Sequence, residues 1–445
     1  MAADPGAQRV LDAVFRETKA IAGASATASV EIRRSANTRF ARGEVTQTGE
    51  SDDAVLSVEI AFGQRHAAVT TNQLDPASVK AAVQRAARLA RIAPEDKEAM
   101  PPLGPQRYPR TPPAADPALG RFDAAARAEV VGQALAAAGE GTELAGFSIS
   151  TLTSTSLGSS AGLRAGGEAS TTELTLTART PDGGGSGWAG ATSHRAGRID
   201  AAALAKTAAD KARRSQKPRK LDPGRYTVVL EHAAVAEILD FLTGSAFQAR
   251  AADEGRNFFS KKGGGNKVGE KLFADAINIV SDPADPDAPG LPFDGQGLPR
   301  APTVWIENGV QKRLFHSRYW AKKSGGTPDA VPHVYHLKGG TAASVDDLVR
   351  GTKRGLLVTR FFYSRWVDRQ TALVTGLTRD GTFLIENGEI VAPVNNFRWN
   401  ESVAAMLHNV EAMTKDSVVT PMEARMRVPA MRIAEFNMAS ISEAV

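Results

Sequence analysis

The last third of the chain contains nearly the same hairpin sequence twice. Residues 303–310 read Thr-Val-Trp-Ile-Glu-Asn-Gly-Val, and residues 382–390 read Thr-Phe-Leu-Ile-Glu-Asn-Gly-Glu-Ile. An Asn-Gly pair between alternating apolar strands is a strong hairpin signal, because both residues readily adopt the positive φ of a type I′ turn. We therefore predict two antiparallel hairpins, with turns at 308–309 and 387–388.

Helical and strand patterns share the rest of the chain without a regular βαβ order. Helical spacing of apolar residues predicts helices over 10–21, 76–91, 123–138, 200–215, 233–251, 345–353 and 403–413. Alternation predicts strands over 28–33, 55–62, 66–70, 143–179, 226–230 and 276–280, with a glycine-rich loop at 183–190. The fold class is therefore α+β with mixed or antiparallel sheets, and the C-terminal part is rich in β-hairpins.

Two breaks in composition divide the chain. Eight of the 24 prolines lie between Pro94 and Pro117, which predicts an extended surface connection at about 94–117. A second break, Lys217–Gly224, combines charge, proline and glycine and suits a domain boundary. We predict two domains, 1–220 and 221–445.

The composition indicates a globular protein without disulfides. Hydrophobic residues make up 42% of the 445 positions, enough for a substantial core. The absence of cysteine excludes disulfides, thiolate nucleophiles and thiolate metal ligands. The chain shows neither a secretory leader pattern nor an apolar run of about 20 residues, so we expect a cytoplasmic protein without a membrane partner.

The net charge of +5 is concentrated in one segment. Seven basic residues and one acid, Asp210, lie between Lys206 and Lys220, so the remainder of the chain is nearly neutral. Such a segment could contact nucleic acid. We favour a solvated helix end followed by a linker, because no interleaved aromatic residues are present for stacking on bases.

Several further motifs resemble one known family. They are the runs 355–365, 375–381 and 390–398 around the second hairpin, together with Thr38–Gln47, Thr71–Asp75, Ala246–Arg250 and Gly290–Asp294. In this order they resemble the TldD/PmbA family, most closely its PmbA (TldE) members. The resemblance implies a two-domain α+β subunit. It would pair with a TldD-like zinc peptidase and enclose a cavity in which unfolded or short peptides are cleaved.

The helix that carries the metal motif in the family's peptidases lacks it here. Those peptidases place His-Glu-x-x-x-His on this helix and add a cysteine ligand; the matching segment here is Glu231–Ser245. The ligand positions should fall between Glu237 and Gly244, where no histidine occurs, and His232 lies too early and lacks a partner. We therefore expect no catalytic residue and no metal in this chain, with zinc in a TldD-like partner.

Family motifs also suggest residues for a peptide groove. The candidates are Arg360, Tyr363, Arg365, Arg379 and Asp380. Alternatively, each of these residues forms a salt bridge within a turn and has no role in peptide binding.

Two other motifs have ordinary interpretations. His333 and His336 are spaced for chelation, but on an extended segment they face opposite sides, so we expect no metal there. The glycine segment 263–269 lacks the Gly-Lys-Ser/Thr of a phosphate loop and is predicted to be a flexible loop; the Lys- and Gly-rich extension 260–267 departs from the family.

The leading hypothesis is a metal-free, peptide-binding subunit of a heterodimeric zinc metallopeptidase, which holds extended peptide while the partner hydrolyses it. One alternative is a stand-alone homodimeric peptide-binding or scaffold protein. The other is a nucleic-acid-linked regulator, suggested by the family's older label of gyrase modulator.

Overall fold

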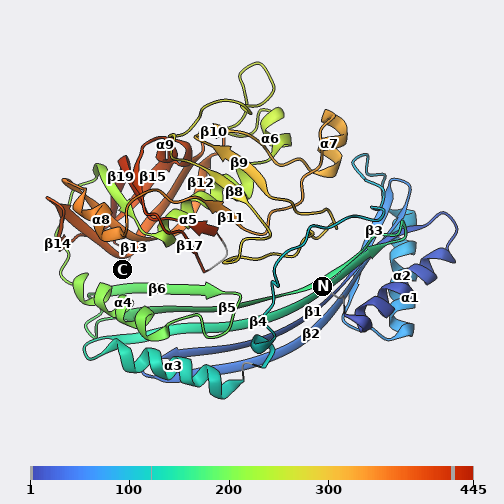
Figure 1. The fold of residues 1–445 in the computed structure, drawn as a ribbon, viewed down its shortest axis with the longest axis horizontal. Coiled ribbons are helices and arrows are strands. Elements are labelled where there is room, and N and C mark those ends of the chain that lie inside the picture. Colours follow the sequence, from blue (N-terminus) through green and yellow to red (C-terminus); the bar gives the residue numbers. More distant parts are fainter. Residues whose placement is uncertain (1–3, 122, 422–425, 444–445) are drawn as a thin grey trace.

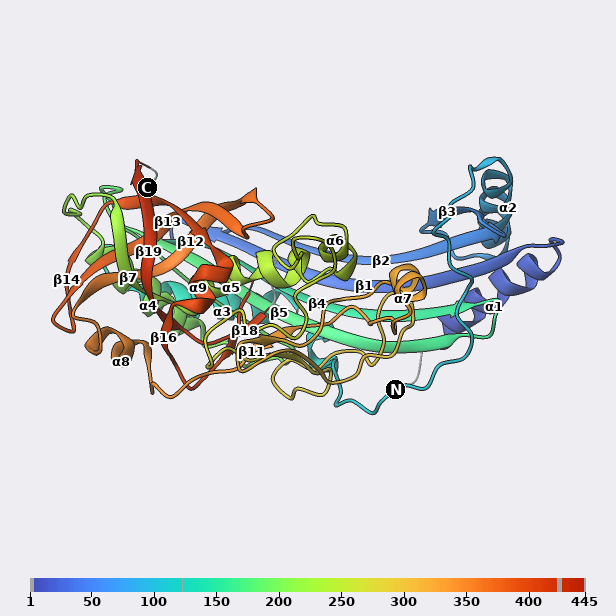
Figure 2. The same cartoon turned by 90° about the horizontal axis from the view of Figure 1, so that it is seen from above.

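One long curved sheet dominates the first half of the chain (Figures 1 and 2). The computed structural model describes residues 4–121, 123–421 and 426–443 and confirms the α+β class. In spatial order the sheet contains β3 (Arg65–Thr71), β2 (Glu44–Phe62), β1 (Ser25–Ala41), β4 (Glu143–Ser159), β5 (Arg164–Arg179) and β6 (Ser186–Ser193), all antiparallel. The sheet therefore joins strands from both sides of the proline-rich connection, because β1 pairs with β4.

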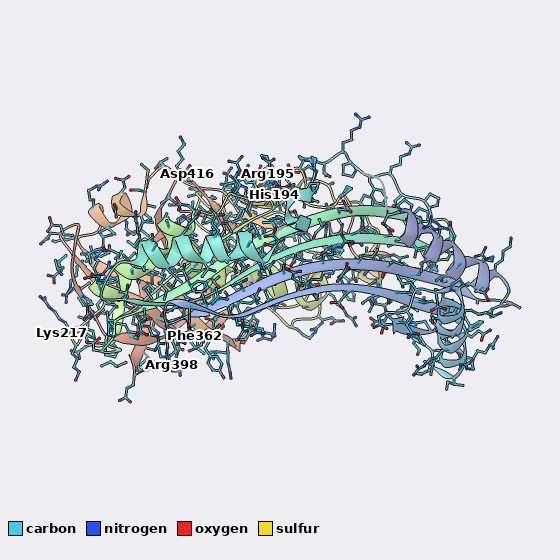
Figure 3. All side chains as sticks on the ribbon, turned by 90° about the horizontal axis from the view of Figure 1, so that it is seen from below. His194, Arg195, Lys217, Phe362, Arg398 and Asp416 are labelled. Carbon is cyan, nitrogen blue, oxygen red and sulfur yellow. The ribbon has the colours of Figure 1, made fainter. Side chains whose placement is uncertain are left out.

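Four helices cover one face of this sheet. They are α1 (Pro5–Lys19), α2 (Pro76–Ile92), α3 (Ala124–Ala138) and α4 (Ala201–Arg214). Alternate side chains near both ends of β1, such as Val30 and Phe40, are buried beneath them. Figure 3 shows α3 lying across this outer face. The predicted helices 76–91, 123–138 and 200–215 are confirmed, and each begins at an aspartate, Asp75, Asp123 or Asp200, whose side chain accepts a backbone N–H bond.

The strands of the first sheet are longer than the sequence pattern predicted. The prediction stopped one strand at residue 33, whereas β1 continues to Ala41. The opposite face of the sheet is polar over this stretch, as the bond of 2.9 Å between the hydroxyls of Ser35 and Ser51 illustrates, so the apolar signal fades while the pairing continues. The predicted loop 183–190 is also wrong in its second part, since β6 begins at Ser186.

The predicted connection 94–117 is extended and irregular, with an isolated bridge from Ala114 to Ala169, and it ends in a short 3-10 helix, Pro117–Arg121.

Five strands of the second half close into a barrel. The ring order is β12 (Arg354–Asp368), β7 (Gly224–Leu230), β19 (Met431–Ser442), β15 (Asn396–Ser402) and β13 (Leu373–Glu386). It closes because β12 pairs with both β7 and β13. Phe361, Trp399 and Phe436 pack within the core, with the first two ring centroids 4.6 Å apart. Two short strands, β14 (Glu389–Pro393) and β16 (Val410–Met413), extend the sheet.

A third sheet consists of short strands. Its order is β10 (Val310–Gln311), β9 (Thr303–Glu307), β8 (Ile279–Ser281), β11 (Tyr335–Leu337), β18 (Met426–Val428) and β17 (Val418–Val419). Both predicted hairpins are confirmed, one between β9 and β10 and the other between β13 and β14. Each turn has positive φ at both residues, with 49° and 74° at Asn308 and Gly309 and 50° and 83° at Asn387 and Gly388.

All three predicted helices of the second half are wrong in extent. Residues 233–251 divide into α5 (His232–Asp240), a π-helical turn η2 (Phe241–Ala246) and α6 (Ala249–Asp253). Thr243 and Ser245 donate hydroxyl bonds to carbonyls four residues earlier, a pattern that loosens a helix. The predicted helix 403–413 ends at His408 as α9 (Val403–His408), because the next residues pair with β19 as β16.

The remaining helices are short: α7 (Arg318–Ser324) and α8 (Val345–Arg350), the latter ending before Gly351 rather than at residue 353.

Candidate functional site

A cavity of about 430 Å³ opens beside helix α5. Its walls come from α5 and the π-helical turn, from the middle of β12, and from Thr420 and Pro421 after β17. Ala233 and Ala236 on α5 leave room, while the polar groups of the wall include the carboxylates of Glu237 and Asp240. The cavity therefore combines small and acidic side chains of α5 with aromatic side chains of the π-helical turn and β12.

Glu237 is the half-buried acid of this cavity. It lies on the second turn of α5, and its Oε1 accepts a bond of 2.7 Å from the hydroxyl of Ser364 on β12. Burial raises the pKa of the Glu237 carboxyl above its ordinary value, against smaller opposing effects of the Ser364 bond and the Arg360 charge. The carboxylate is thus held in a position where water stabilises it poorly.

A bulge in β12 forms the rim of the cavity. The pairing register between β12 and β13 shifts between Phe362 and Arg365. Within this bulge Tyr363 adopts a φ of 59° and is 61% exposed. Such bulges redirect side chains and often adjoin functional sites. The Arg365 guanidinium stacks on the Tyr363 ring at 3.9 Å, and the Arg379 guanidinium stacks on Phe362 at 4.2 Å. Figure 3 shows Phe362 on the side of the molecule opposite to His194.

Arg360 and Asp380 connect the barrel to the first sheet. The Arg360 Nη1 lies 3.1 Å from Asp380 Oδ2, and Asp380 Oδ1 accepts a bond of 2.6 Å from the hydroxyl of Ser186. The guanidinium also lies 4.8 Å from the ring centroid of Trp188 on β6. Because both side chains are mostly buried, this pair serves as a junction between the two halves of the chain.

The five groove residues predicted from the sequence lie around the bulge, in different positions. Arg360 and Tyr363 line the cavity, Arg365 and Arg379 stack on aromatic side chains of its rim, and Asp380 is buried behind it. Their role in peptide binding stays a prediction.

Sequence reasoning missed four polar residues of the cavity, namely Glu237, Asp240, Ser364 and Thr420. The signal available for Glu237 was a lone carboxylate within the otherwise apolar stretch Ala233–Leu239.

The residues of the cavity do not fit a zinc ion. A zinc site in a protein uses at least three donor side chains, commonly histidine or cysteine, whereas two carboxylates and a guanidinium line this cavity. His232 lies at the start of α5, where burial lowers the pKa of its imidazole. Across residues 4–121, 123–421 and 426–443, no group of three or more histidine, aspartate or glutamate side chains is arranged to hold a metal.

The histidine pair at 333 and 336 has other contacts. His336 lies on β11, 3.8 Å from Asp285, and burial lowers the pKa of its imidazole.

Much of the basic segment 206–220 makes internal contacts. Lys211 forms an ion pair of 2.6 Å with Glu231 at the start of α5, and Arg213 donates a bond to the carbonyl of Ala138. Arg214 lies 5.4 Å from the ring centroid of Phe383. These three cations hold α4 against its neighbours.

The glycine segment 263–269 is a loop, as predicted, and the Lys267 ammonium at its end bonds to the carbonyl of Phe258 at 2.6 Å.

Family models match most of the chain. Those described as PmbA/TldA metallopeptidase domain 1, central domain and C-terminal domain match residues 26–90, 110–216 and 223–440. Among the residues that the structure describes, no helix is long and apolar enough to cross a membrane.

Curated relatives match parts of the chain. A metalloprotease of Methanothermobacter thermautotrophicus is 26% identical over 232 residues, which make up 49% of this chain and 49% of that protein. A metalloprotease TldD homolog of Buchnera aphidicola is 24% identical over 188 residues, or 39% of this chain and 37% of that protein. The matched region thus spans half or less of each relative.

Solved structures match the whole fold. TldE from Thermococcus kodakarensis aligns with a TM-score of 0.87 at 18% identity, covering 96% of this chain and 99% of that one. A Thermotoga maritima protein, described as a proposed modulator of a DNA gyrase, aligns with a TM-score of 0.84 at 17% identity, covering 97% and 99%. Taken with the three family models and the shared fold, these matches show that the chain belongs to the PmbA/TldD family of metallopeptidase-like proteins.

Proposed function

We propose that this chain is a metal-free, TldE-like subunit of a heteromeric zinc metallopeptidase. It supplies peptide-binding surface and cavity walls, while a TldD-like partner holds the zinc and hydrolyses unfolded or short peptides. The proposal assigns it to the cytoplasm, where disulfides are rare, in keeping with the absence of cysteine.

The observation that carries the proposal is the composition of helix α5 and its cavity. The helix contributes Glu237 and Asp240, without the paired histidines of a peptidase, and the whole sequence lacks the cysteine ligand. A hydrolytic zinc centre needs three protein ligands and an open position for water, so this helix supports a binding role better than a catalytic one.

The test is to purify the chain alone and together with a TldD-like subunit of the same organism. We expect far less than one zinc per chain in the isolated protein by metal analysis. We expect zinc and cleavage of an unfolded polypeptide in the co-purified complex. A partner whose His-Glu-x-x-x-His glutamate is replaced by alanine is the matched control, and it should assemble without cleaving.

Stoichiometric zinc in the isolated chain, or cleavage without the partner, contradicts the proposal. Failure to form a complex would favour the homodimeric alternative, which size-exclusion chromatography with light scattering distinguishes. The contacts of Lys211, Arg213 and Arg214 within the protein give the nucleic-acid alternative less support.

A further inference from the structure

We propose that the cavity beside α5 binds a primary ammonium group carried on an alkyl chain, such as a lysine side chain or the N-terminus of a peptide. The inference rests on the proposed function only in taking the ligand to be part of a peptide. Its binding step needs neither zinc nor a partner subunit.

The size and walls of the cavity suit such a ligand. A volume of about 430 Å³ lies within the range of small-ligand sites. Aromatic side chains line it from two elements, Phe241 from the π-helical turn and Phe362 and Tyr363 from β12. Apolar walls would bury the methylene groups, and ring faces attract cations.

Glu237 supplies a carboxylate that has no ion-pair partner among the residues that the structure describes. Its bonding partner is the neutral hydroxyl of Ser364 at 2.7 Å, and it forms no ion pair with any residue in the described part of the chain. A half-buried carboxylate without a cation is unfavourable unless a ligand compensates it. An ammonium ion in the cavity would provide both the opposite charge and hydrogen-bond donors.

The neighbouring guanidinium is already engaged. Arg360 forms an ion pair of 3.1 Å with Asp380 and lies over Trp188, so it attracts Glu237 only from a distance. The Glu237 carboxylate therefore favours a cationic ligand over a carboxylate or phosphate at its own position in the cavity.

The rim shows that its rings accept cations. Arg365 and Arg379 stack on Tyr363 and Phe362 at 3.9 and 4.2 Å, and neither guanidinium lines the cavity itself. The lining cation that the structure describes is Arg360, which leaves the ammonium position beside Glu237 to a ligand.

Calorimetric titration of the isolated chain with capped tripeptides tests the inference. We expect acetyl-Ala-Lys-Ala-amide to bind about tenfold more tightly than acetyl-Ala-norleucine-Ala-amide, the factor expected for one charge-assisted hydrogen bond. Ala-norleucine-Ala-amide, with a free N-terminus, distinguishes the two sources of ammonium. A preference for it over its acetylated form would identify the peptide N-terminus as the bound group.

Three variants sharpen the result. Glu237→Gln keeps the shape and should remove the preference for the charged peptide, and Asp240→Asn should reduce it. Glu307→Gln removes an exposed carboxylate from the β9–β10 hairpin and should leave the preference unchanged. Circular dichroism melting verifies that each variant is folded.

Equal affinity for all three peptides, or a preference that survives in Glu237→Gln, overturns the inference. Such a result leaves the proposed subunit role intact, provided that the complex with the partner cleaves peptides. Zinc in the isolated chain would overturn the subunit role without changing the titration.

Discussion

Glu237 shows how one residue's surroundings can be tuned for binding at the expense of stability. Burial raises the pKa of its carboxyl, so the folded state binds the proton more tightly than the unfolded state. Its contribution to stability is therefore fully present below the ordinary pKa of 4.5 and is lost as the pH rises through the folded value. At neutral pH the ionised side chain destabilises the fold.

We accordingly expect Glu237→Gln to raise the free energy of unfolding at pH 7, and the gain to shrink as the pH falls toward 4.5. The amide oxygen can still accept the Ser364 bond. Urea unfolding at both pH values measures the effect, with Glu307→Gln as the exposed control. A variant less stable than the parent at pH 7 would show that the charge is compensated after all.

Asp380 permits a test of its structural role. Removing it takes away the carboxylate that lies 3.1 Å from the Arg360 guanidinium, whose side chain is 14% exposed. We expect Asp380→Ala to cost about 3 to 5 kcal/mol in urea unfolding.

Asp52→Ala, which breaks an exposed pair with Arg34 at 3.2 Å, is the control and should cost at most about 1 kcal/mol. A similarly small loss of unfolding free energy in both variants would contradict the junction role of Asp380. Asp380 would then again be a candidate for the peptide groove.

At the level of elements, the hairpin turns combine two constraints on glycine. Gly309 has a φ of 74°, and a Cβ there would lie 2.2 Å from the carbonyl oxygen of Phe273. Gly63, in the turn between β2 and β3, has a φ of 62° with no atom within 4 Å of the same position. Alanine at Gly63 would test backbone strain alone, whereas alanine at Gly309 would test backbone strain together with a steric clash.

Gly63→Ala should cost about 1 to 2 kcal/mol, the strain of a left-handed residue. Gly309→Ala should cost distinctly more, because the backbone of residue 273 must also move. Thermal and urea unfolding of both variants measure the difference. Equal losses of unfolding free energy would show that the backbone at Phe273 moves away without cost.

Elements were predictable where the signal was local. The Asn-Gly turns and the helices that begin at Asp75, Asp123 and Asp200 follow from a few adjacent residues. The division of 233–251 and the pairing of β16 with β19 depend on distant segments. The helices predicted from apolar spacing were therefore too long in both places.

The cavity was harder to predict for the same reason. Glu237 reads as an exposed helix residue until the bulge of β12, far along the chain, places Ser364 against it. The family motifs led to the lining residues Arg360 and Tyr363, whereas the acidic wall was marked locally by the lone carboxylate of Glu237 in an apolar stretch.

At the scale of the whole molecule, the first sheet contains strands from both sides of the proline-rich connection. We expect a fragment of residues 1–220 to fold alone, because it contains all six strands and four helices of this layer. A fragment of residues 1–95 should aggregate, since the edge of β1 that pairs with β4 would be exposed.

Circular dichroism and size-exclusion chromatography of the two fragments test this expectation and the predicted boundary at residue 220. A soluble, folded fragment 1–95 would show that the first three strands are a unit of their own.

The closed barrel also determines when this protein can finish folding. Strand β19 (Met431–Ser442) sits between β7 and β15, although it comes last of the five along the chain. During synthesis β7 must therefore wait, with one side open, until residues 431–442 have left the ribosome. Nascent chains stalled before that point should present a chaperone-binding surface that released chains lack.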